Sequence, residues 1–204
     1  MIDHRLKHLP GYVLLFAATV LLVACGTRVD RIGADEAPDL SGRWNATDSR
    51  LVSEEMVQDM LSRQWLDNHR RQAGEQPTVI VGDIRNLSHE HINTGTFIND
   101  IERQVINSGE VSFVAGDELR KAIREERRDQ DIHALEETRN PMGREIGADY
   151  MLTGTITTIT DVEGRTEVIY YQVNLSLTSI ADNRRVWIGQ KEIQKVIQRG
   201  RFRS

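Results

Sequence analysis

A strict alternation of side-chain types over residues 168–178 restricts the fold of this 204-residue chain more than any other feature of its sequence. Successive side chains of a β-strand point to opposite faces of a sheet, so the segment is typical of a strand with one buried and one wet face. It therefore predicts a sheet that packs on one side only. The apolar set is Ile169, Tyr171, Val173, Leu175 and Leu177, and the other set is Tyr170, Gln172, Asn174 and Ser176.

Two further strands are expected beside this one. Residues 150–160 are rich in Thr and Ile, and residues 186–196 begin with Val-Trp-Ile, as strands commonly do. The connections at 161–164 and 181–184 are short enough for hairpins between antiparallel strands.

Earlier in the chain, short apolar runs alternate with amphipathic segments. Strands are expected at 78–81 and 111–114, and helices at about 48–71, 97–106, 117–129 and 140–147. Two strands between helices, followed by three consecutive strands, predict an α+β fold. We expect a mixed sheet of about five strands with the helices largely on one face.

Side chains are expected to cap the starts of two of these helices. Asp48 or Ser49 is the predicted N-cap of the first helix, and Asp117 is the predicted cap of the third. Lys121 lies four residues after Asp117, which predicts an ion pair on the helix surface.

The N-terminal segment has the pattern of a lipoprotein signal peptide. Basic residues precede an uncharged apolar run of about 13 residues, Tyr12–Ala24, which is too short to span a bilayer that requires about 20. The run ends in Leu-Val-Ala-Cys-Gly, which resembles a bacterial lipobox with Cys25 as the lipid-attachment residue. We therefore expect a signal peptide at 1–24, a lipidated tether at 25–40 and a single globular α/β domain at 41–204.

The lipobox also predicts where the protein resides. More than one acyl chain on Cys25 gives stable membrane anchoring. Gly26, rather than Asp, follows the cysteine, and by similarity to enterobacterial lipoproteins this favours the outer membrane, with the domain facing the periplasm. About 15 tether residues reach at most ~50 Å when fully extended.

Composition and motifs argue against several function classes. The net charge is −5, which disfavours nucleic-acid binding, and no nucleotide-binding or hydrolase motif occurs. The only cysteine is the one expected to be acylated. His89 and His91 flank Glu90 in a metal-like pattern, but no third ligand follows at a recognisable spacing. We expect neither an enzyme nor a metal, a cofactor or a small-molecule substrate.

The polar loop at 83–94 has two interpretations. In the structural one, Asn93 or Thr94 caps the following helix and Asn86 holds the turn through its side chain. In the functional one, the loop contacts a partner protein, because binding residues concentrate on loops held by rigid elements. Asn86, His91, Asn93 and Thr94 are the candidate partner-binding residues.

Several segments together resemble one known family. They are Asp39–Asn45, Asn86–Thr94, Gly147–Ile156, Tyr171–Leu175 and Val186-Trp187. In these segments the chain resembles the LpoB-type penicillin-binding-protein activators, which are outer-membrane lipoproteins, and the likeness extends over most of residues 39–197. The resemblance implies a domain similar to the N-terminal domain of TolB. It also implies stimulation of a bifunctional peptidoglycan synthase, a penicillin-binding protein, by docking on its small accessory domain.

A second function class stays open. Gly-Ala-Asp-Tyr at 147–150 also recurs in secretion-channel lipoproteins of the curli type. The alternative is therefore a structural or assembly lipoprotein of the cell envelope, such as a subunit of a curli-type or flagellar-base ring.

Overall fold

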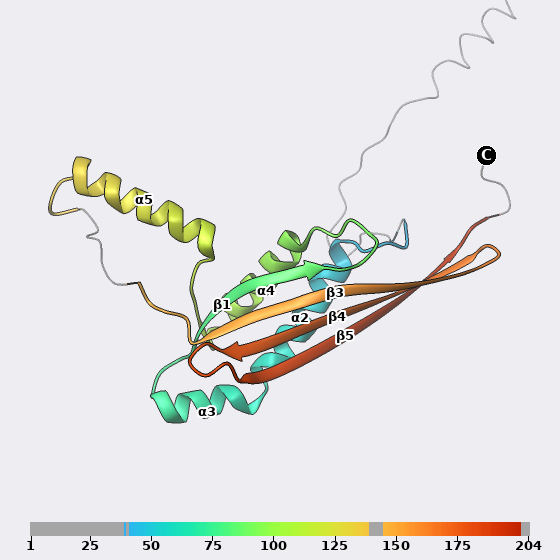
Figure 1. Cartoon of the computed structure of the whole chain (residues 1–204), viewed down its shortest axis with the longest axis horizontal. Coiled ribbons are helices and arrows are strands. Elements are labelled where there is room, and N and C mark those ends of the chain that lie inside the picture. Colours follow the sequence, from blue (N-terminus) through green and yellow to red (C-terminus); the bar gives the residue numbers. More distant parts are fainter. Residues whose placement is uncertain (1–38, 40, 139–144, 201–204) are drawn as a thin grey trace, which may run out of the picture. The chain divides into compact units, whose positions relative to one another are not determined.

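Five strands form one sheet in the order β2-β1-β3-β4-β5 in the computed structural model, which describes residues 39, 41–138 and 145–200 (Figure 1). The strands are β1 (Thr78–Asn86), β2 (Ser112–Phe113), β3 (Tyr150–Glu163), β4 (Thr166–Ser179) and β5 (Arg185–Gln198). β1 pairs in parallel with β2 and β3, whereas β3–β4 and β4–β5 are antiparallel. The predicted α+β class with a mixed sheet is confirmed.

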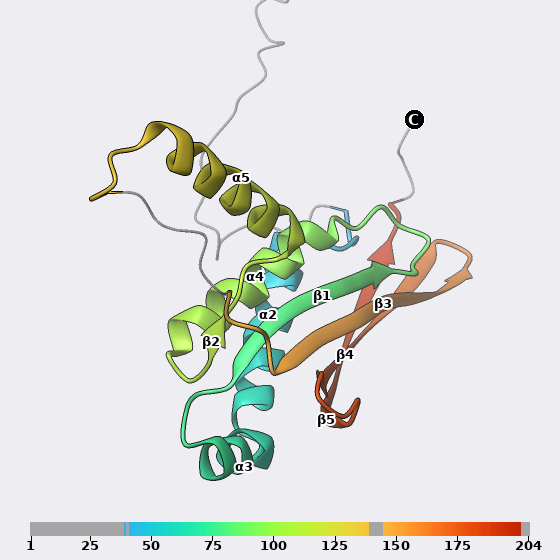
Figure 2. The same ribbon diagram turned by 60° about the vertical axis from the view of Figure 1, so that its left-hand side comes forward.

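The helices that build the core lie on one side of this sheet (Figure 2). They are α2 (Ala46–Leu61) and α4 (Thr94–Ser108), which pack on each other, with α2 also contacting β5 and α4 also contacting β1. The described chain further contains α3 (Gln64–Ala73) and α5 (Asp117–His133). No described helix combines the length and the apolarity that crossing a membrane would require.

The alternation in β4 sorts its side chains between core and surface as predicted. The apolar set is at most 3% exposed and faces α2 and α4, in the cluster that contains Val52, Met60, Phe97 and Ile101. The second set is partly exposed on the open face of the sheet. Burial of one side of β4 therefore supplies much of the apolar area that stabilises the fold.

The predicted first helix is in fact two helices. α2 ends at Leu61, Arg63 is extended (φ −91°, ψ 154°), and α3 then begins at Gln64. The break lets Trp65 turn inward, where it is 5% exposed and its indole N–H donates to the carbonyl of Met60 at 2.7 Å.

The predicted N-cap of the first helix was also wrong. Asn45 caps α2, and Asp48 is the third helical residue, whose carboxylate accepts from the Asn45 N–H.

Other element boundaries differ from the sequence predictions. β1 continues to Asn86 because Ile84 is buried beyond a register shift in the pairing with β3. Gly116, rather than Asp117, is the N-cap of α5, although the predicted ion pair between Asp117 and Lys121 is present at 2.8 Å. Residues 145–148 are not helical, and the start of the predicted 140–147 helix lies outside the described residues.

The segment after Asp39 is attached to β5 through a buried lysine. The Lys195 ammonium is 9% exposed and lies 2.7 Å from the Asp39 carboxylate and 2.5 Å from that of Asp48. It also donates to the carbonyl of Arg43 at 2.9 Å. This lysine therefore joins the beginning of the described chain, the start of α2 and the last strand.

The predicted signal peptide, Cys25 and almost all of the predicted tether lie outside the described residues.

Candidate partner-binding site

Asn86, the last residue of β1, shapes the loop that leads to α4. Its amide nitrogen donates to the carbonyl of Glu90 at 2.8 Å. Its amide oxygen accepts from the backbone N–H of Ser88 at 2.9 Å and from the Ser88 hydroxyl at 2.6 Å. These bonds close the loop on itself, as the structural interpretation of Asn86 expected.

Glu90 fastens the same loop to the sheet. Both of its carboxylate oxygens accept from the hydroxyl of Tyr171 on β4 at 2.9 Å, and one accepts from the backbone N–H of Trp44 at 3.4 Å. The Trp44 ring lies 5.6 Å from the Tyr171 ring and 6.1 Å, edge-on, from that of Phe97. The loop, the segment before α2 and β4 thus share one cluster, which holds the loop rigid.

The Tyr171 hydroxyl remains a hydrogen-bond donor over the whole physiological pH range. Its side chain is fully buried, and burial raises its pKa far above the ordinary value of a tyrosine. The bond to the Glu90 carboxylate raises this pKa further, because it favours the protonated hydroxyl. The donor of this contact between loop and sheet therefore does not change near neutral pH.

The alternation His89-Glu90-His91 orients three side chains in two directions. Glu90 points to the sheet, whereas both histidines are exposed. Among the described residues, no cluster of three or more His, Cys, Asp or Glu side chains is arranged to hold a metal ion. The imidazole of His91 is therefore accessible at the surface of the loop.

Asn93 and Thr94 have different roles at the start of α4. Asn93 is the N-cap, and its side-chain oxygen accepts from the N–H of Gly95 at 3.0 Å. Thr94 is the first helical residue and is partly exposed. The four predicted residues therefore lie together on one loop, with Asn86 and Asn93 serving its local structure.

Sequence reasoning missed the residues that hold this loop in place. Glu90, Trp44 and Tyr171 are far apart in the chain, and no local pattern links them. One signal was present, because the alternation that exposes His89 and His91 also turns Glu90 inward. The apolar setting of Tyr171 in β4 then provides the partner for that carboxylate.

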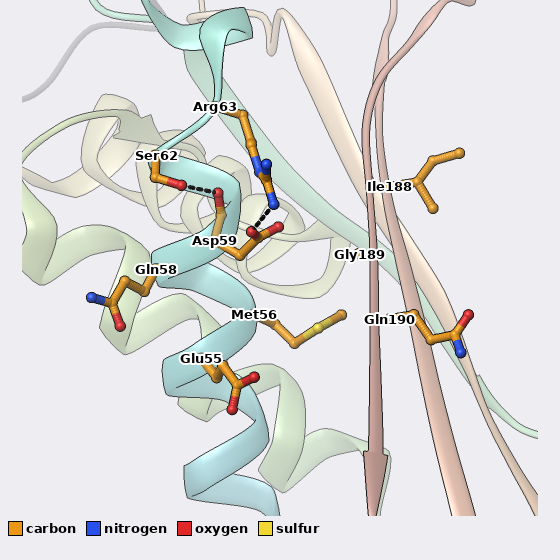
Figure 3. A pocket seen from close by; sticks show the side chains of 9 residues that line it. All are labelled: Glu55, Met56, Gln58, Asp59, Ser62, Arg63, Ile188, Gly189 and Gln190. Carbon is orange, nitrogen blue, oxygen red and sulfur yellow. Dashed lines mark hydrogen bonds and ion pairs between the residues drawn. The ribbon is translucent and has the colours of Figure 1, made fainter.

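A second candidate surface, which is concave, lies between α2 and β5 (Figure 3). It has a volume of about 510 Å³ and is lined by Glu55, Met56, Gln58, Asp59, Ser62, Arg63, Ile188, Gly189 and Gln190. We refer to it as the α2–β5 groove. No sequence motif pointed to it, because its two walls come from opposite ends of the domain's sequence.

Trp187 and Asp59 fix the geometry of the α2–β5 groove. The Trp187 indole N–H donates to the Asp59 carboxylate at 2.8 Å, and the Arg63 guanidinium pairs with the same carboxylate. The bond from Arg63 lowers the pKa of Asp59, and so does the bond from Trp187. The Trp187 ring lies so close to Gly189 that a β-carbon there would be 2.2 Å from a ring carbon. Only glycine fits at this position of β5.

Comparison with known families identifies the chain. The model of the family described as peptidoglycan-synthase activator LpoB matches residues 48–193, more than half of the sequence. The chain belongs to the LpoB family. The resemblance indicated by the sequence segments is thereby confirmed. No match was found among curated proteins.

Solved structures of LpoB are among the similar folds. The C-terminal domain of LpoB from Salmonella enterica is 13% identical over 72% of this chain and 98% of that one, with a TM-score of 0.43. Escherichia coli LpoB, solved by NMR, is 15% identical over 87% and 85% of the two chains, with a TM-score of 0.42. Lipoprotein GNA1162 from Neisseria meningitidis is 12% identical over 59% and 83%, with a TM-score of 0.38.

The LpoB match includes both surfaces described above. It begins at Asp48 in α2 and ends at Ile193 in β5, and so contains the 86–94 loop, Tyr171 and every residue that lines the α2–β5 groove. Membership places the chain in a family of activators of peptidoglycan synthases. That family is one of regulatory activators rather than of catalysts.

Proposed function

We propose that this protein is a non-catalytic lipoprotein that stimulates a bifunctional peptidoglycan synthase, a penicillin-binding protein, by binding it directly. The observation that carries the proposal is the LpoB family match over residues 48–193. In the proposal the protein works through contact alone, without a cofactor, a nucleic acid or a small-molecule substrate. Its effect is a change in the rate of its partner.

The sequence supports an outer-membrane location for this activity. In the proposal the signal peptide at 1–24 is removed, Cys25 is acylated, and residues 25–40 join the lipid to a domain that faces the periplasm. A tether of about 15 residues keeps the domain within ~50 Å of its membrane.

The 86–94 loop is the proposed contact with the synthase. It is anchored by Asn86 and Glu90 and presents the exposed imidazole of His91, and Asn93 and Thr94 border it at the start of α4. A loop held by a rigid scaffold binds with little loss of conformational entropy. Asn86 and Asn93 contribute by fixing the loop conformation that the partner meets.

The deciding experiment measures glycan-strand polymerisation by the organism's own bifunctional synthases, with and without the full chain purified from membranes in detergent. We expect a higher polymerisation rate for at least one synthase and no turnover by the protein alone. Absence of stimulation at protein concentrations above the micromolar range would favour the alternative, a structural or assembly lipoprotein of the envelope.

A further inference from the structure

The ends of β3, β4 and β5 form an arm that extends past α2 and α4 (Figure 1). It consists of residues 159–170 and 193–199, and its strand pairs are antiparallel throughout. The backbone N–H of Arg199 donates to the carbonyl of Arg165 at 3.0 Å, which joins the end of β5 to the turn between β3 and β4. We refer to these residues as the arm.

The open face of the sheet changes from polar to apolar at the arm. Along the middle of β3 and β4 this face carries hydroxyl and amide groups, as is usual for a face in water: Thr153, Thr155, Thr157, Gln172, Asn174 and Ser176. On the arm the same face carries four side chains that we call the arm patch: Ile159, Val168, Tyr170 and Val196. Strand pairing places Ile159 opposite Tyr170 and Val168 opposite Val196. Ile159 is 68% exposed and Val196 is 62% exposed.

The charges around the arm patch do not favour a partner of either sign. Glu167 is paired with Arg199 at 2.6 Å, and the hydroxyl of Tyr170 donates to Glu192. Apart from Lys195, which is buried against Asp39 and Asp48, acidic and basic side chains are balanced in this part of the sequence. The acidic ones are Asp161, Glu163, Glu167 and Glu192, and the basic ones are Arg165, Arg199, Arg201 and Arg203. The surface is therefore apolar with a nearly neutral border.

The expected membrane tether enters the domain at this arm. Asp39, the first described residue, has its carboxylate 2.7 Å from the ammonium of Lys195. With Glu167 and Arg199 it also lines a hollow of about 840 Å³. A tether of about 15 residues reaches at most ~50 Å. If Cys25 carries the proposed lipid, the bilayer is thus a large surface that is always held near the arm.

We propose that the arm patch rests on the surface of the phospholipid bilayer in which the lipid on Cys25 is anchored. This inference rests on the lipid anchor of the proposed function. Ile159 and Val196 enter the boundary between headgroups and acyl chains, and Tyr170 lies at the headgroup level, where tyrosine is enriched in membrane proteins. The tether makes the contact intramolecular, so a small apolar patch is sufficient. A nearly neutral border suits the zwitterionic headgroups.

The contact would orient the 86–94 loop away from the membrane. Tyr171, which holds this loop through Glu90, points to the opposite face of β4 from Tyr170. With the open face against the bilayer, the helices and the loop face the periplasm. The same contact that seats the arm on its membrane therefore leaves the proposed synthase-binding loop accessible.

Two matched cysteine substitutions test the arm patch. Ile159 and Ile188 both lie on the open face, 68% and 63% exposed, but they pair with β4 residues six positions apart, about 20 Å along the strand. Cys25, the only natural cysteine, is expected to be acylated, so Ile159→Cys or Ile188→Cys supplies a single free thiol for the fluorophore nitrobenzoxadiazole. The full chain is purified from membranes, its acylation is verified by mass spectrometry, and it is reconstituted in vesicles of phosphatidylethanolamine and phosphatidylglycerol.

Quenching by nitroxide-labelled lipid in these vesicles is the measurement. We expect at least half of the fluorescence to be quenched at position 159 and less than a tenth at position 188. Val196→Asp, added to the Ile159→Cys chain, should reduce the quenching at least twofold, with an unchanged circular dichroism spectrum as the control for folding.

Four outcomes would overturn the inference. They are equal quenching at the two positions, no quenching at position 159, blue-shifted fluorescence there that lipid does not quench, and a Cys25 without acyl chains. The third would show that a protein covers the patch instead. Stimulation of the synthase is measured separately on the unlabelled chain, so the proposed activation can hold even where the arm patch fails.

Discussion

The Glu90 carboxylate accepts a hydrogen bond from the hydroxyl of Tyr171, which is fully buried on β4, at 2.9 Å from each of its oxygens. This contact joins the candidate binding loop to the centre of the sheet. The loop therefore owes its position to the core, and a substitution in the core can alter the loop without touching its exposed residues.

Removal of this hydroxyl should destabilise the protein and change its response to alkaline pH. We expect Tyr171→Phe to lower the free energy of unfolding by about 1–2 kcal/mol at pH 7, because the partly buried Glu90 carboxylate loses a donor. The pKa of Tyr171 is raised in the folded state, so its contribution is complete below the unfolded pKa of about 10 and is lost as pH rises above that value. The stability difference between the two proteins in urea unfolding should therefore shrink above pH 10. A constant difference up to pH 11 would contradict the assignment.

The cap of α4 can be tested by a pair of alanine substitutions. Asn93→Ala should cost roughly 1 kcal/mol, because the N–H of Gly95 loses its acceptor. Thr94→Ala, one residue later, should cost less than about 0.5 kcal/mol, since Thr94 is not the capping residue. Chemical denaturation of both variants measures the two values, and the reverse order would exclude Asn93 as the cap.

His91 separates binding from folding. Its imidazole is exposed, so we expect His91→Ala to leave the melting temperature unchanged and to weaken synthase binding in a direct binding assay. His133→Ala, on the exposed surface of α5, is the control and should alter neither quantity. A lower melting temperature with normal binding would assign His91 a structural role instead.

Lys195 should matter far more to stability than Lys191, although both are paired lysines of β5. Lys195→Ala leaves the Asp48 carboxylate, which is 11% exposed, without its cation, and we expect a loss of about 3 kcal/mol. Lys191 is 32% exposed and its partner Glu55 is 60% exposed, so Lys191→Ala should cost less than about 1 kcal/mol. Urea unfolding of the two variants gives the comparison.

The Lys195 contact also predicts a dependence on acidic pH. The hydrogen bond from Lys195 lowers the pKa of Asp39 in the folded state. Its contribution is therefore present above the unfolded pKa of about 3.9 and is lost as pH falls through the lower folded value. The stability difference between the unsubstituted protein and Lys195→Ala should decrease below pH 4.

Cys25→Ser tests the predicted anchor. Without a thiol the chain cannot receive its lipid, so we expect an unprocessed or soluble species in cell fractionation. The mature fold should be unaffected, and the circular dichroism spectrum of the purified variant is the control. Normal processing together with outer-membrane fractionation would contradict the lipobox assignment.

The local sequence was sufficient to predict elements whose pattern of apolar and polar side chains is set by burial of one face. The alternation of β4 identified the side chains that this strand contributes to the core, including Tyr171. The break between α2 and α3 was not predictable in this way. It depends on Trp65 packing beneath α2, a contact that the helical pattern through residue 71 does not show.

Long-range contacts explain the remaining differences. Gly82 and Asp83 interrupt the apolar run of β1, yet pairing with β3 carries the strand on to Asn86. The 86–94 loop could be predicted as a candidate binding site because its residues are consecutive in the sequence. The α2–β5 groove was not, because α2 and β5 meet only after the whole sheet has formed.

The connection between β2 and β3 has a consequence for how this protein can change over generations. It contains α5, of which no residue is buried, and it leaves the sheet from the short β2 edge rather than from the core. Substitutions in α5 alter surface charge without disturbing packed side chains, and insertions beside it lengthen a strand connection without shifting the register of β3 against β4. The sequence of α5 can therefore diverge over generations. The 86–94 loop and the α2–β5 groove can change less, because the strands that support them, β1, β4 and β5, belong to the packed sheet.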